Sequence, residues 1–272
     1  MRFCANVSIL FTDAPFLARF ARARAVGFTA VEFWWPAGED LGRVEAAIAE
    51  AGLEVALFNF DAGEMAKGDR GLTNDPDREA RFRENVPVAL ALAHRLGCPR
   101  LNALVGLERA GASRDAQLER ARANVAWAAD RAAELGIGVT IEAINTVENG
   151  PYLLTSTEAA AAFVRAIGRP NVQLQYDVYH MCVMGEDPCL ELRRHVGWIA
   201  HVQIADFPGR NEPGTGTIPF GAVFTELERQ GYRGLVGLEY RPSRGDTEAS
   251  FGWLPVAARG GDLAAAALTV TR

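Results

Sequence analysis

Gly138-Val139-Thr140-Ile141-Glu142-Ala143-Ile144-Asn145 is an apolar run that carries a carboxylate near its end, and its pattern recurs along the chain. The run is typical of a short buried strand that ends at Glu142. A charged side chain in such a place is costly to bury unless something there needs its charge. Three later strands end on polar residues in the same way, in the stretches Leu174-Gln175-Tyr176-Asp177, His201-Val202-Gln203 and Leu238-Glu239.

Short strand-like runs alternate with longer helical patterns throughout the chain. The other expected strands are residues 3–8, 30–34, 53–59, 100–105, 172–177, 198–205 and 235–240. The expected helices are residues 15–25, 41–51, 75–96, 114–135, 157–167, 189–195 and 220–230, and the third begins at the capping pair Asp75-Pro76. Eight strands in βα order predict an α/β fold, a (β/α)₈ TIM barrel that forms a single domain.

The alternative architecture is an open doubly wound sheet. No GxGxxG motif follows the first strand, and eight units suit a closed barrel better. We expect the barrel to span residues 1–256. Residues 257–272 are an Ala-rich C-terminal tail, either a final helix or a loose end.

The composition is that of an ordinary globular protein, with 272 residues, 49% hydrophobic and 23% charged. A net charge of −6 argues against a nucleic-acid partner. No apolar run approaches the ~18 residues that a membrane span needs. The four cysteines are too sparse for a disulfide framework. We therefore expect a cytoplasmic protein with no membrane partner, and a homo-oligomer is left open.

Alternate residues of a barrel strand face the interior. An inward Glu142 leaves the apolar residues of its strand facing the helices, and the same holds for Asp177 and Glu239. The polar residues therefore meet at the C-terminal ends of the strands, where barrel enzymes build their sites. The second, third and fourth strands end in the same way on Glu32, Asn59 and Asn102, and the two asparagines are candidates for substrate contact.

Two Glu, one Asp and one Gln that converge at one end of a barrel need a positive partner. Without one, repulsion and desolvation would raise their pKa values by units. Carboxylate and amide oxygens suit Mg²⁺ or Mn²⁺ better than Zn²⁺. The sequence therefore predicts a divalent cation, Mg²⁺ or Mn²⁺, held by Glu142, Asp177, Gln203 and Glu239.

Other polar residues are candidates for substrate binding. His180 lies just beyond the Asp177 strand, and Arg210 follows the seventh strand, where it could pair with a substrate carboxylate. Lys67 and Arg70 lie in the long glycine-containing connection 60–74; they are either part of a lid over an anionic substrate or solvated charges. His201 lies one layer deeper than Gln203 and is expected to be a hydrogen-bonded core histidine.

Several motifs are specific in combination. They are Cys4-Ala5-Asn6-Val7-Ser8, Ile141-Glu142-Ala143-Ile144-Asn145, Gln175-Tyr176-Asp177-Val178-Tyr179-His180-Met181, His201-Val202-Gln203-Ile204-Ala205-Asp206 and Glu212-Pro213-Gly214-Thr215-Gly216. Because of these motifs, nearly the whole chain, as far as about Trp253, resembles the hydroxypyruvate isomerase family of xylose-isomerase-like TIM barrels. The resemblance implies that Glu142 and Glu239 are the catalytic pair and that the four residues named above hold the metal. Relatives often have His-Asn where this chain has Phe58-Asn59.

The resemblance implies a metal-dependent aldose–ketose isomerase of a small hydroxy-oxo acid. The reaction would convert hydroxypyruvate to tartronate semialdehyde through an enediolate, with proton transfer between two Glu. The alternatives on the same barrel are a 2-oxo-tetronate isomerase and a ketose epimerase. A DNA-repair endonuclease would need a His-rich multi-zinc site, which four histidines and an acidic chain do not favour. A non-catalytic ligand-binding barrel would not need the paired glutamates.

Overall fold

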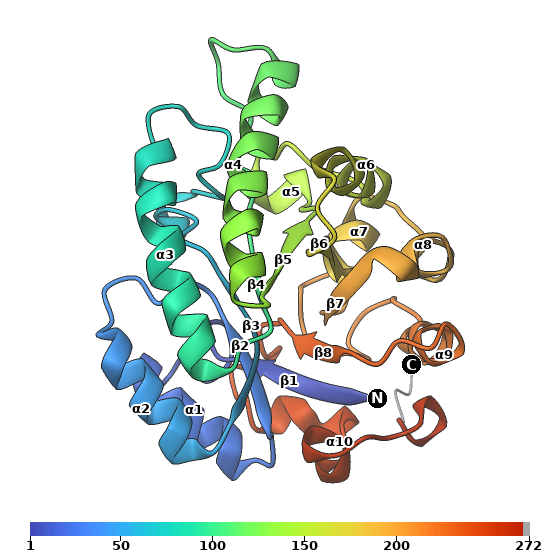
Figure 1. Cartoon of the computed structure of the whole chain (residues 1–272). Helices are drawn as coiled ribbons and strands as arrows, with labels where there is room; N and C mark the ends of the chain where they lie inside the picture. The colour runs from blue at the N-terminus through green and yellow to red at the C-terminus, as the bar shows by residue number, and fades with distance from the viewer. Residues whose placement is uncertain (269–272) are drawn as a thin grey trace.

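The computed structural model of the chain describes residues 1–268, and in it eight parallel strands close into a barrel (Figure 1). Each strand pairs with the next one in the chain, and the last pairs with the first. The strands are β1 Arg2–Asn6, β2 Ala30–Phe33, β3 Glu54–Asn59, β4 Arg100–Asn102, β5 Gly138–Glu142, β6 Val172–Asp177, β7 Ile199–Ile204 and β8 Leu235–Leu238. The predicted (β/α)₈ barrel is therefore confirmed.

Helices connect the strands and surround the barrel (Figure 1). The main ones are α1 Phe16–Ala25, α2 Leu41–Ala51, α3 Glu79–Leu96, α4 Arg114–Glu134, α6 Thr157–Ile167, α8 Pro188–His195 and α9 Phe220–Arg229. Shorter elements are α5 Thr146–Asn149, α7 Val178–Val183, α10 Val256–Gly260, η1 Met65–Lys67, η2 Val196–Trp198, η3 Ala249–Trp253 and η4 Ala265–Ala267. None of the helices within residues 1–268 is long and apolar enough to cross a membrane.

Local sequence signals set most helix boundaries. Ser156 accepts a hydrogen bond from the third residue of α6, which satisfies a backbone donor left free at the helix start. Gly168 ends the same helix in the left-handed conformation, which glycine adopts without steric cost. Asp187 caps α8, and Pro188 at its first turn loses no hydrogen bond there. These helices begin and end within one residue of the predicted limits.

Helix α3 begins four residues later than its sequence predicts. The Asp75 carboxylate does not cap it; one oxygen instead accepts the Asp77 amide at 3.0 Å and the other lies 2.6 Å from Arg109 of the β4–α4 connection. The residue before the helix is Arg78, which makes no capping bond with its side chain. A tertiary ion pair therefore overrides the local capping signal, and the prediction that Asp75-Pro76 opens the helix is wrong.

Six of the strands are shorter than predicted, and one of them, β8, ends before its polar residue of interest. β4 stops at Asn102 rather than at 105, and β8 stops at Leu238, so Glu239 directly follows its strand. Register brings the polar ends together: Glu142 pairs with Gln175, and Asp177 pairs with Gln203. In each pair the inward side chains of neighbouring strands lie at the same level, so the strand ends share one site.

Apolar side chains on the outer face of the barrel pack against the helices. Phe33 of β2 stacks on Phe58 of β3 with ring centroids 5.1 Å apart, and Phe20 of α1 meets Phe33 edge-on at 5.9 Å. All three side chains are buried, and burying a phenyl ring stabilises a fold by about 1.5–3 kcal/mol. This packing fixes which residues of β2 and β3 face inward.

The last described residues return to the start of the chain. Arg259 of α10 donates to the Val26 carbonyl at 2.9 Å, and the Leu263 amide donates to the Met1 carbonyl at 3.0 Å. In Figure 1, α10 lies beside the amino-terminal end of β1. The expected limit of the barrel at residue 256 stays a prediction, and residues 269–272 of the predicted tail lie outside the described residues.

Candidate active site

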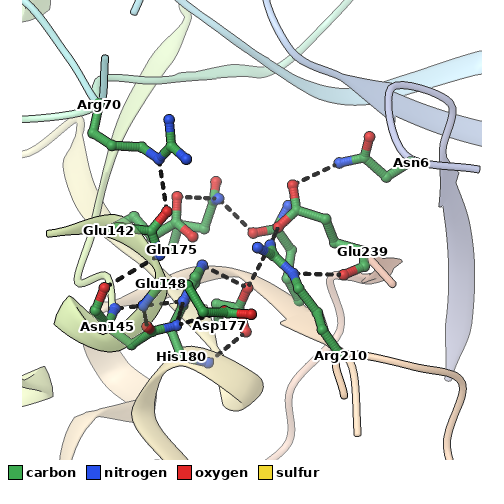
Figure 2. Close-up of polar contacts among 12 residues, drawn as sticks. Asn6, Arg70, Glu142, Asn145, Glu148, Gln175, Asp177, His180, Arg210 and Glu239 are labelled. Carbon is green, nitrogen blue, oxygen red and sulfur yellow. Dashed lines mark hydrogen bonds and ion pairs between the residues drawn. The ribbon is translucent and has the colours of Figure 1, made fainter. Parts of the chain in front are cut away.

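Four polar side chains meet at the C-terminal end of the barrel. Glu142 and Asp177 end β5 and β6, Gln203 lies near the end of β7, and Glu239 directly follows β8. All four are buried. Oxygen atoms of the three carboxylates, together with a ring nitrogen of His180, lie within 4.8 Å of one another (Figure 2). The strand ends named by the sequence therefore form one compact cluster.

The three carboxylates are crowded in a place with little water. Burial raises the pKa of Glu142 well above its usual range, and the charges of Glu239 and Asp177 raise it further. Burial also raises the pKa of Asp177 to about 7, although the Arg210 cation opposes that shift. The pKa of Glu239 is raised by burial too, again against Arg210. The site therefore carries more negative charge than one arginine can compensate.

Arg210 is the cation built into the cluster. Its Nη2 lies 2.7 Å from Glu239 and 4.0 Å from Asp177, so the guanidinium points between the two carboxylates (Figure 2). The side chain is buried and also lies over the Tyr179 ring, 5.4 Å from its centroid. The backbone of Arg210 has φ of 55°, a conformation that non-glycine residues seldom adopt.

The loop that carries Arg210 is folded around Asp206. One carboxylate oxygen of Asp206 accepts the amides of Gly214 and Gly216, each at 2.8 Å. The other accepts the amides of Phe207 at 2.9 Å and Ile218 at 3.1 Å. A Cβ at position 216 would lie 2.2 Å from the Phe207 carbonyl, which explains the glycine there. Asp206 thereby fixes the loop from which Arg210 enters the site.

Neutral N–H donors, three side-chain amides and one indole, orient the two glutamates. Glu142 accepts from Asn102 Nδ2 and from Gln175 Nε2, each at 2.9 Å on the same oxygen. Glu239 accepts from Asn6 Nδ2 at 3.0 Å and from Trp34 Nε1 at 2.8 Å. Each donor comes from a strand or strand end next to the barrel axis. The two carboxyl groups are therefore held by fixed donors rather than left to rotate.

His180 is neutral and carries its proton on Nε2. Burial lowers its pKa well below the usual range, with Arg210 and Arg70 acting in the same direction. Asn145 Nδ2 lies 2.6 Å from His180 Nδ1, and an amide nitrogen can only donate. Asn145 cannot be turned the other way, because its oxygen accepts the Glu148 amide at 2.9 Å. Nδ1 is thus the acceptor, and Nε2–H faces Asp177 at 3.7 Å.

The residues fit a divalent cation. Asp177 Oδ2 is buried and has no hydrogen-bond partner among residues 1–268, and the Arg210 guanidinium, 4.0 Å away, lies beyond hydrogen-bond distance; an unpaired carboxylate oxygen in such a place is costly. The surrounding oxygens belong to carboxylates and to the Gln203 amide, a donor set that suits Mg²⁺ or Mn²⁺. With its proton on Nε2, His180 has no lone pair to offer on that side. Gln203 is therefore the better fourth ligand.

Comparison with known proteins agrees with this geometry. The family model of the xylose isomerase-like TIM barrel matches residues 20–256. The chain belongs to this family. The hydroxypyruvate isomerase of Escherichia coli (strain K12) is 38% identical over 254 residues, which cover 93% of the chain and 98% of that protein. The 2-oxo-tetronate isomerase of Cupriavidus necator is 39% identical over 257 residues, with 93% and 97% covered.

A solved structure has the same fold over nearly the same length. The crystal structure described as an AP endonuclease of family 2 from Brucella melitensis superposes with a TM-score of 0.88 at 39% identity, covering 93% of this chain and 97% of that one. The predicted resemblance to the family is thus confirmed. The curated relatives described above are isomerases, as the sequence predicts for this family member.

The other predicted substrate-binding residues are placed unequally. Arg70 lies above the carboxylate cluster, where its Nε donates to Asn149 at 2.6 Å (Figure 2). Burial lowers its pKa, and the nearby Arg210 lowers it further. Lys67 is exposed on η1 and pairs with Glu64 at 2.6 Å, away from the cluster. Asn59 is buried at the end of β3, in register with Asn102, and so lies one strand further from Glu142.

Several residues of this family site are missed by sequence reasoning. Asn6 and Gln175 contact the glutamates, while Asn145 and Glu148 hold His180 and its surroundings. Asn6 could have been found, because it ends β1 as Glu142 ends β5. Gln175 could also have been found, since it lies two residues before Asp177 on the same face. Asn145 and Glu148 belong to a short loop helix with no repeating pattern.

Proposed function

We propose that this chain is a metal-dependent aldose–ketose isomerase of a small hydroxy-oxo acid, with hydroxypyruvate as the leading substrate. The observation that carries the proposal is the pair Glu142 and Glu239, whose carboxylates lie within 4.8 Å of each other beside Asp177. Two carboxyl groups so close can serve two neighbouring carbons of one small molecule. The names of the relatives support the reaction class.

The reaction needs one proton to move between adjacent carbons. In the direction of hydroxypyruvate, one glutamate takes a proton from C3, and an enediolate forms. The other glutamate gives a proton to C2, while the proton of the C3 hydroxyl is transferred to the oxygen on C2. The product is tartronate semialdehyde, and no electron enters or leaves the molecule. Acid–base assistance of this kind is worth roughly 10²–10⁴-fold in rate.

Side chains of the cluster and two nearby arginines would hold the substrate and balance its negative charge. Glu142, Asp177, Gln203 and Glu239 would hold the cation, which when bound supplies positive charge next to the two reacting oxygens. Arg70 and Arg210 are close enough for the charge of Arg210 to lower the pKa of Arg70, so an anionic substrate between them would relieve their repulsion. Two desolvated guanidinium groups favour a substrate with a carboxylate. Burial of the cluster excludes water from the enediolate.

A 2-oxo-tetronate isomerase is the second candidate. Its relative from Cupriavidus necator is as similar to the chain as the hydroxypyruvate isomerase of Escherichia coli, at 39% against 38% identity. Both substrates carry a carboxylate, and a free ketose does not, so the arginines favour either acid over a ketose epimerase. A multi-zinc endonuclease is disfavoured, because His180 is the one histidine that takes part in the described cluster.

Proton exchange tests the proposal. The protein is treated with a chelator, Mg²⁺ or Mn²⁺ is added back, and deuterium incorporation in deuterated water is followed by NMR. The panel contains hydroxypyruvate, 2-oxo-tetronates and four- to six-carbon ketoses. We expect metal-dependent exchange and isomerisation, fastest with an acid. Exchange that does not depend on the metal, or no exchange with any member of the panel, would contradict the proposal.

A further inference from the structure

A second group of polar side chains lies deeper in the barrel than the site itself. Cys4 of β1, Glu32 of β2 and His201 of β7 are completely buried. His201 Nε2 lies 2.5 Å from Glu32 Oε2, and Cys4 Sγ lies 3.4 Å from the same oxygen. His201 is thus the hydrogen-bonded core histidine that its position predicts. We call these three residues the Glu32 cluster.

The other oxygen of Glu32 reaches upward into the site. Glu32 Oε1 accepts from Gln203 Nε2 at 2.7 Å and from Asn6 Nδ2 at 3.0 Å. The same Asn6 nitrogen donates to Glu239 at 3.0 Å. Glu32 Oε1 therefore contacts two side-chain amides. One belongs to Gln203, which is a candidate metal ligand, and the other belongs to Asn6, which donates to the candidate metal ligand Glu239.

This contact decides which way each amide faces. A carboxylate oxygen accepts and does not donate, so the NH₂ end of each amide must point at Glu32. The oxygen of Gln203 is then directed to the other side, where it accepts from Gln175 Nε2 at 2.6 Å. Gln175 Nε2 also donates to Glu142, which places the Gln203 oxygen next to the carboxylate cluster. If Gln203 were turned over, its oxygen would face that of Glu32 and its nitrogen would face the site.

The barrel has room for Glu32 because a strand opposite lacks a side chain. A Cβ on Gly237 of β8 would lie 2.3 Å from Glu32 Oε2 and 2.5 Å from Oε1. His201 and Cys4 occupy Oε2, so Oε1 is the oxygen left for the two amides. Side chains of β1, β2 and β7 and the bare backbone of β8 therefore converge on one carboxyl group.

We propose that Glu32 is a positioning residue for the metal site, one that fixes the amides of Gln203 and Asn6 so that the Gln203 oxygen faces the cation. The inference rests on the proposed metal-dependent function. Glu32 itself touches neither the substrate nor the reacting atoms. Partners that orient metal ligands in this way typically contribute 10–100-fold to metal affinity or activity.

The Glu32 cluster does not itself suit a metal. The distance of 2.5 Å between His201 and Glu32 is that of a direct hydrogen bond, which leaves no space for an ion between them. Burial and the neighbouring Glu32 raise the pKa of the Cys4 thiol, so it stays protonated and is a poor ligand. The cluster is better explained as the support beneath the site.

Metal binding to a set of matched variants tests the inference. The chelator-treated protein is titrated with Mn²⁺, and free Mn²⁺ is measured by electron paramagnetic resonance, with kcat and KM recorded alongside. For Glu32→Leu we expect the Kd for Mn²⁺ to rise about 10–100-fold. Glu32→Gln should restore most of the affinity, because its oxygen can accept from both amides while its nitrogen faces His201 Nε2.

Two further variants separate positioning from packing. Cys4→Ala removes a contact on the far side of the same carboxylate and should leave the Kd for Mn²⁺ unchanged. Gly237→Ala keeps the charge of Glu32 but places a methyl group against it, and should weaken Mn²⁺ binding as Glu32→Leu does. If Glu32→Leu does not fold, Gly237→Ala decides the question.

The outcomes distinguish this inference from the proposed function. A wild-type protein that does not bind Mn²⁺ contradicts the proposed function. If the wild type binds Mn²⁺ and Glu32→Leu binds it equally well, the positioning role is overturned. Equal losses in Glu32→Leu and Glu32→Gln overturn it too, since acceptance by an oxygen would then not matter. A comparable loss in Cys4→Ala would also overturn it, because packing beneath the site, and not the contacts of Glu32 with the two amides, would then account for the loss.

Discussion

The two halves of the barrel contribute different kinds of side chain to the site. Strands β5 to β8 and the loops after them supply the charged groups, namely Glu142, Asp177, Arg210 and Glu239. Strands β1 to β4 supply mostly neutral donors that hold those groups, namely Asn6, Trp34 and Asn102. Most of the charge therefore comes from the second half of the chain and several of the orienting donors from the first half, with Gln175 of β6 and Arg70 after β3 as exceptions.

The largest effect is expected from the charged half. Glu142→Gln and Glu239→Gln each keep the shape of the side chain but remove its ability to take a proton. Turnover should fall by at least about 10²–10⁴-fold. The melting temperature of metal-free Glu142→Gln should not fall, because burial and repulsion from Glu239 and Asp177 disfavour the ionised Glu142 carboxylate. Near-normal turnover in either variant would remove that glutamate from the mechanism.

A smaller effect is expected from the neutral half. Asn102→Ala removes one of two amides that donate to Glu142, at 2.9 Å, and leaves Gln175 in place. We expect kcat/KM to fall about 10–100-fold, with the Kd for Mn²⁺ rising in parallel. Asn124→Ala is the matched control, because Asn124 is also buried but donates to the Thr73 carbonyl. Equal losses of kcat/KM in both variants would show that the effect is only structural.

The connection 60–74 offers a matched pair of basic residues, of which Arg70 lies over the site and Lys67 lies away from it. Arg70 is half-buried near Arg210, whereas Lys67 is exposed and paired with Glu64. Arg70→Ala should raise KM for a carboxylate substrate about tenfold, the value of one charge-assisted hydrogen bond. Lys67→Ala should leave both KM and kcat unchanged. If Lys67→Ala raised KM and Arg70→Ala did not, the roles proposed for the two side chains would be reversed.

The smallest effect concerns the stability of that same connection. The Arg78 guanidinium donates to both oxygens of Asp69, at 2.8 and 2.6 Å, and lowers the pKa of Asp69 from 3.8 to about 2. A carboxyl group with a lowered pKa stabilises the fold fully above its ordinary pKa and loses that contribution as pH falls toward the lower value. Asp69→Asn should therefore cost about 1 kcal/mol near neutral pH, because the pair is partly exposed.

Thermal unfolding of wild type and Asp69→Asn between pH 7 and pH 2 checks the sign. The difference in melting temperature should be constant above about pH 4, the ordinary range of the aspartate pKa, and should shrink below it. A difference that grows as the pH falls would contradict the role of the Arg78 contact.

Much of this site could be predicted because strand geometry is simple. Side chains alternate across a strand with period two, so an apolar run that ends on Glu142 or Asp177 indicates both the inward face and the end of the strand. Parallel strands then bring those ends to one side of the barrel. The four candidate metal ligands follow from this reasoning alone, before any coordinate is known.

The relative depth of residues on different strands could not be predicted in the same way. Glu32 ends its predicted strand just as Asn59 and Asn102 end theirs, yet it lies beneath the site, paired with His201. Depth depends on how neighbouring strands are staggered, and β2 and β3 shift register between Val31 and Glu32. The stagger between two strands cannot be predicted from the sequence of either strand alone. The late start of α3 has a similar cause, since Arg109 lies in a different connection from Asp75.

The loop around Asp206 has a consequence for the thermodynamics of substrate binding. Four backbone amides of the loop donate to one carboxylate, so residues 206–218 lose their conformational freedom when the chain folds. Arg210 is then already in place when a substrate arrives, and ordering this loop adds nothing to the entropy lost on binding. A contact between Arg210 and the substrate is therefore not weakened by the cost of ordering this loop.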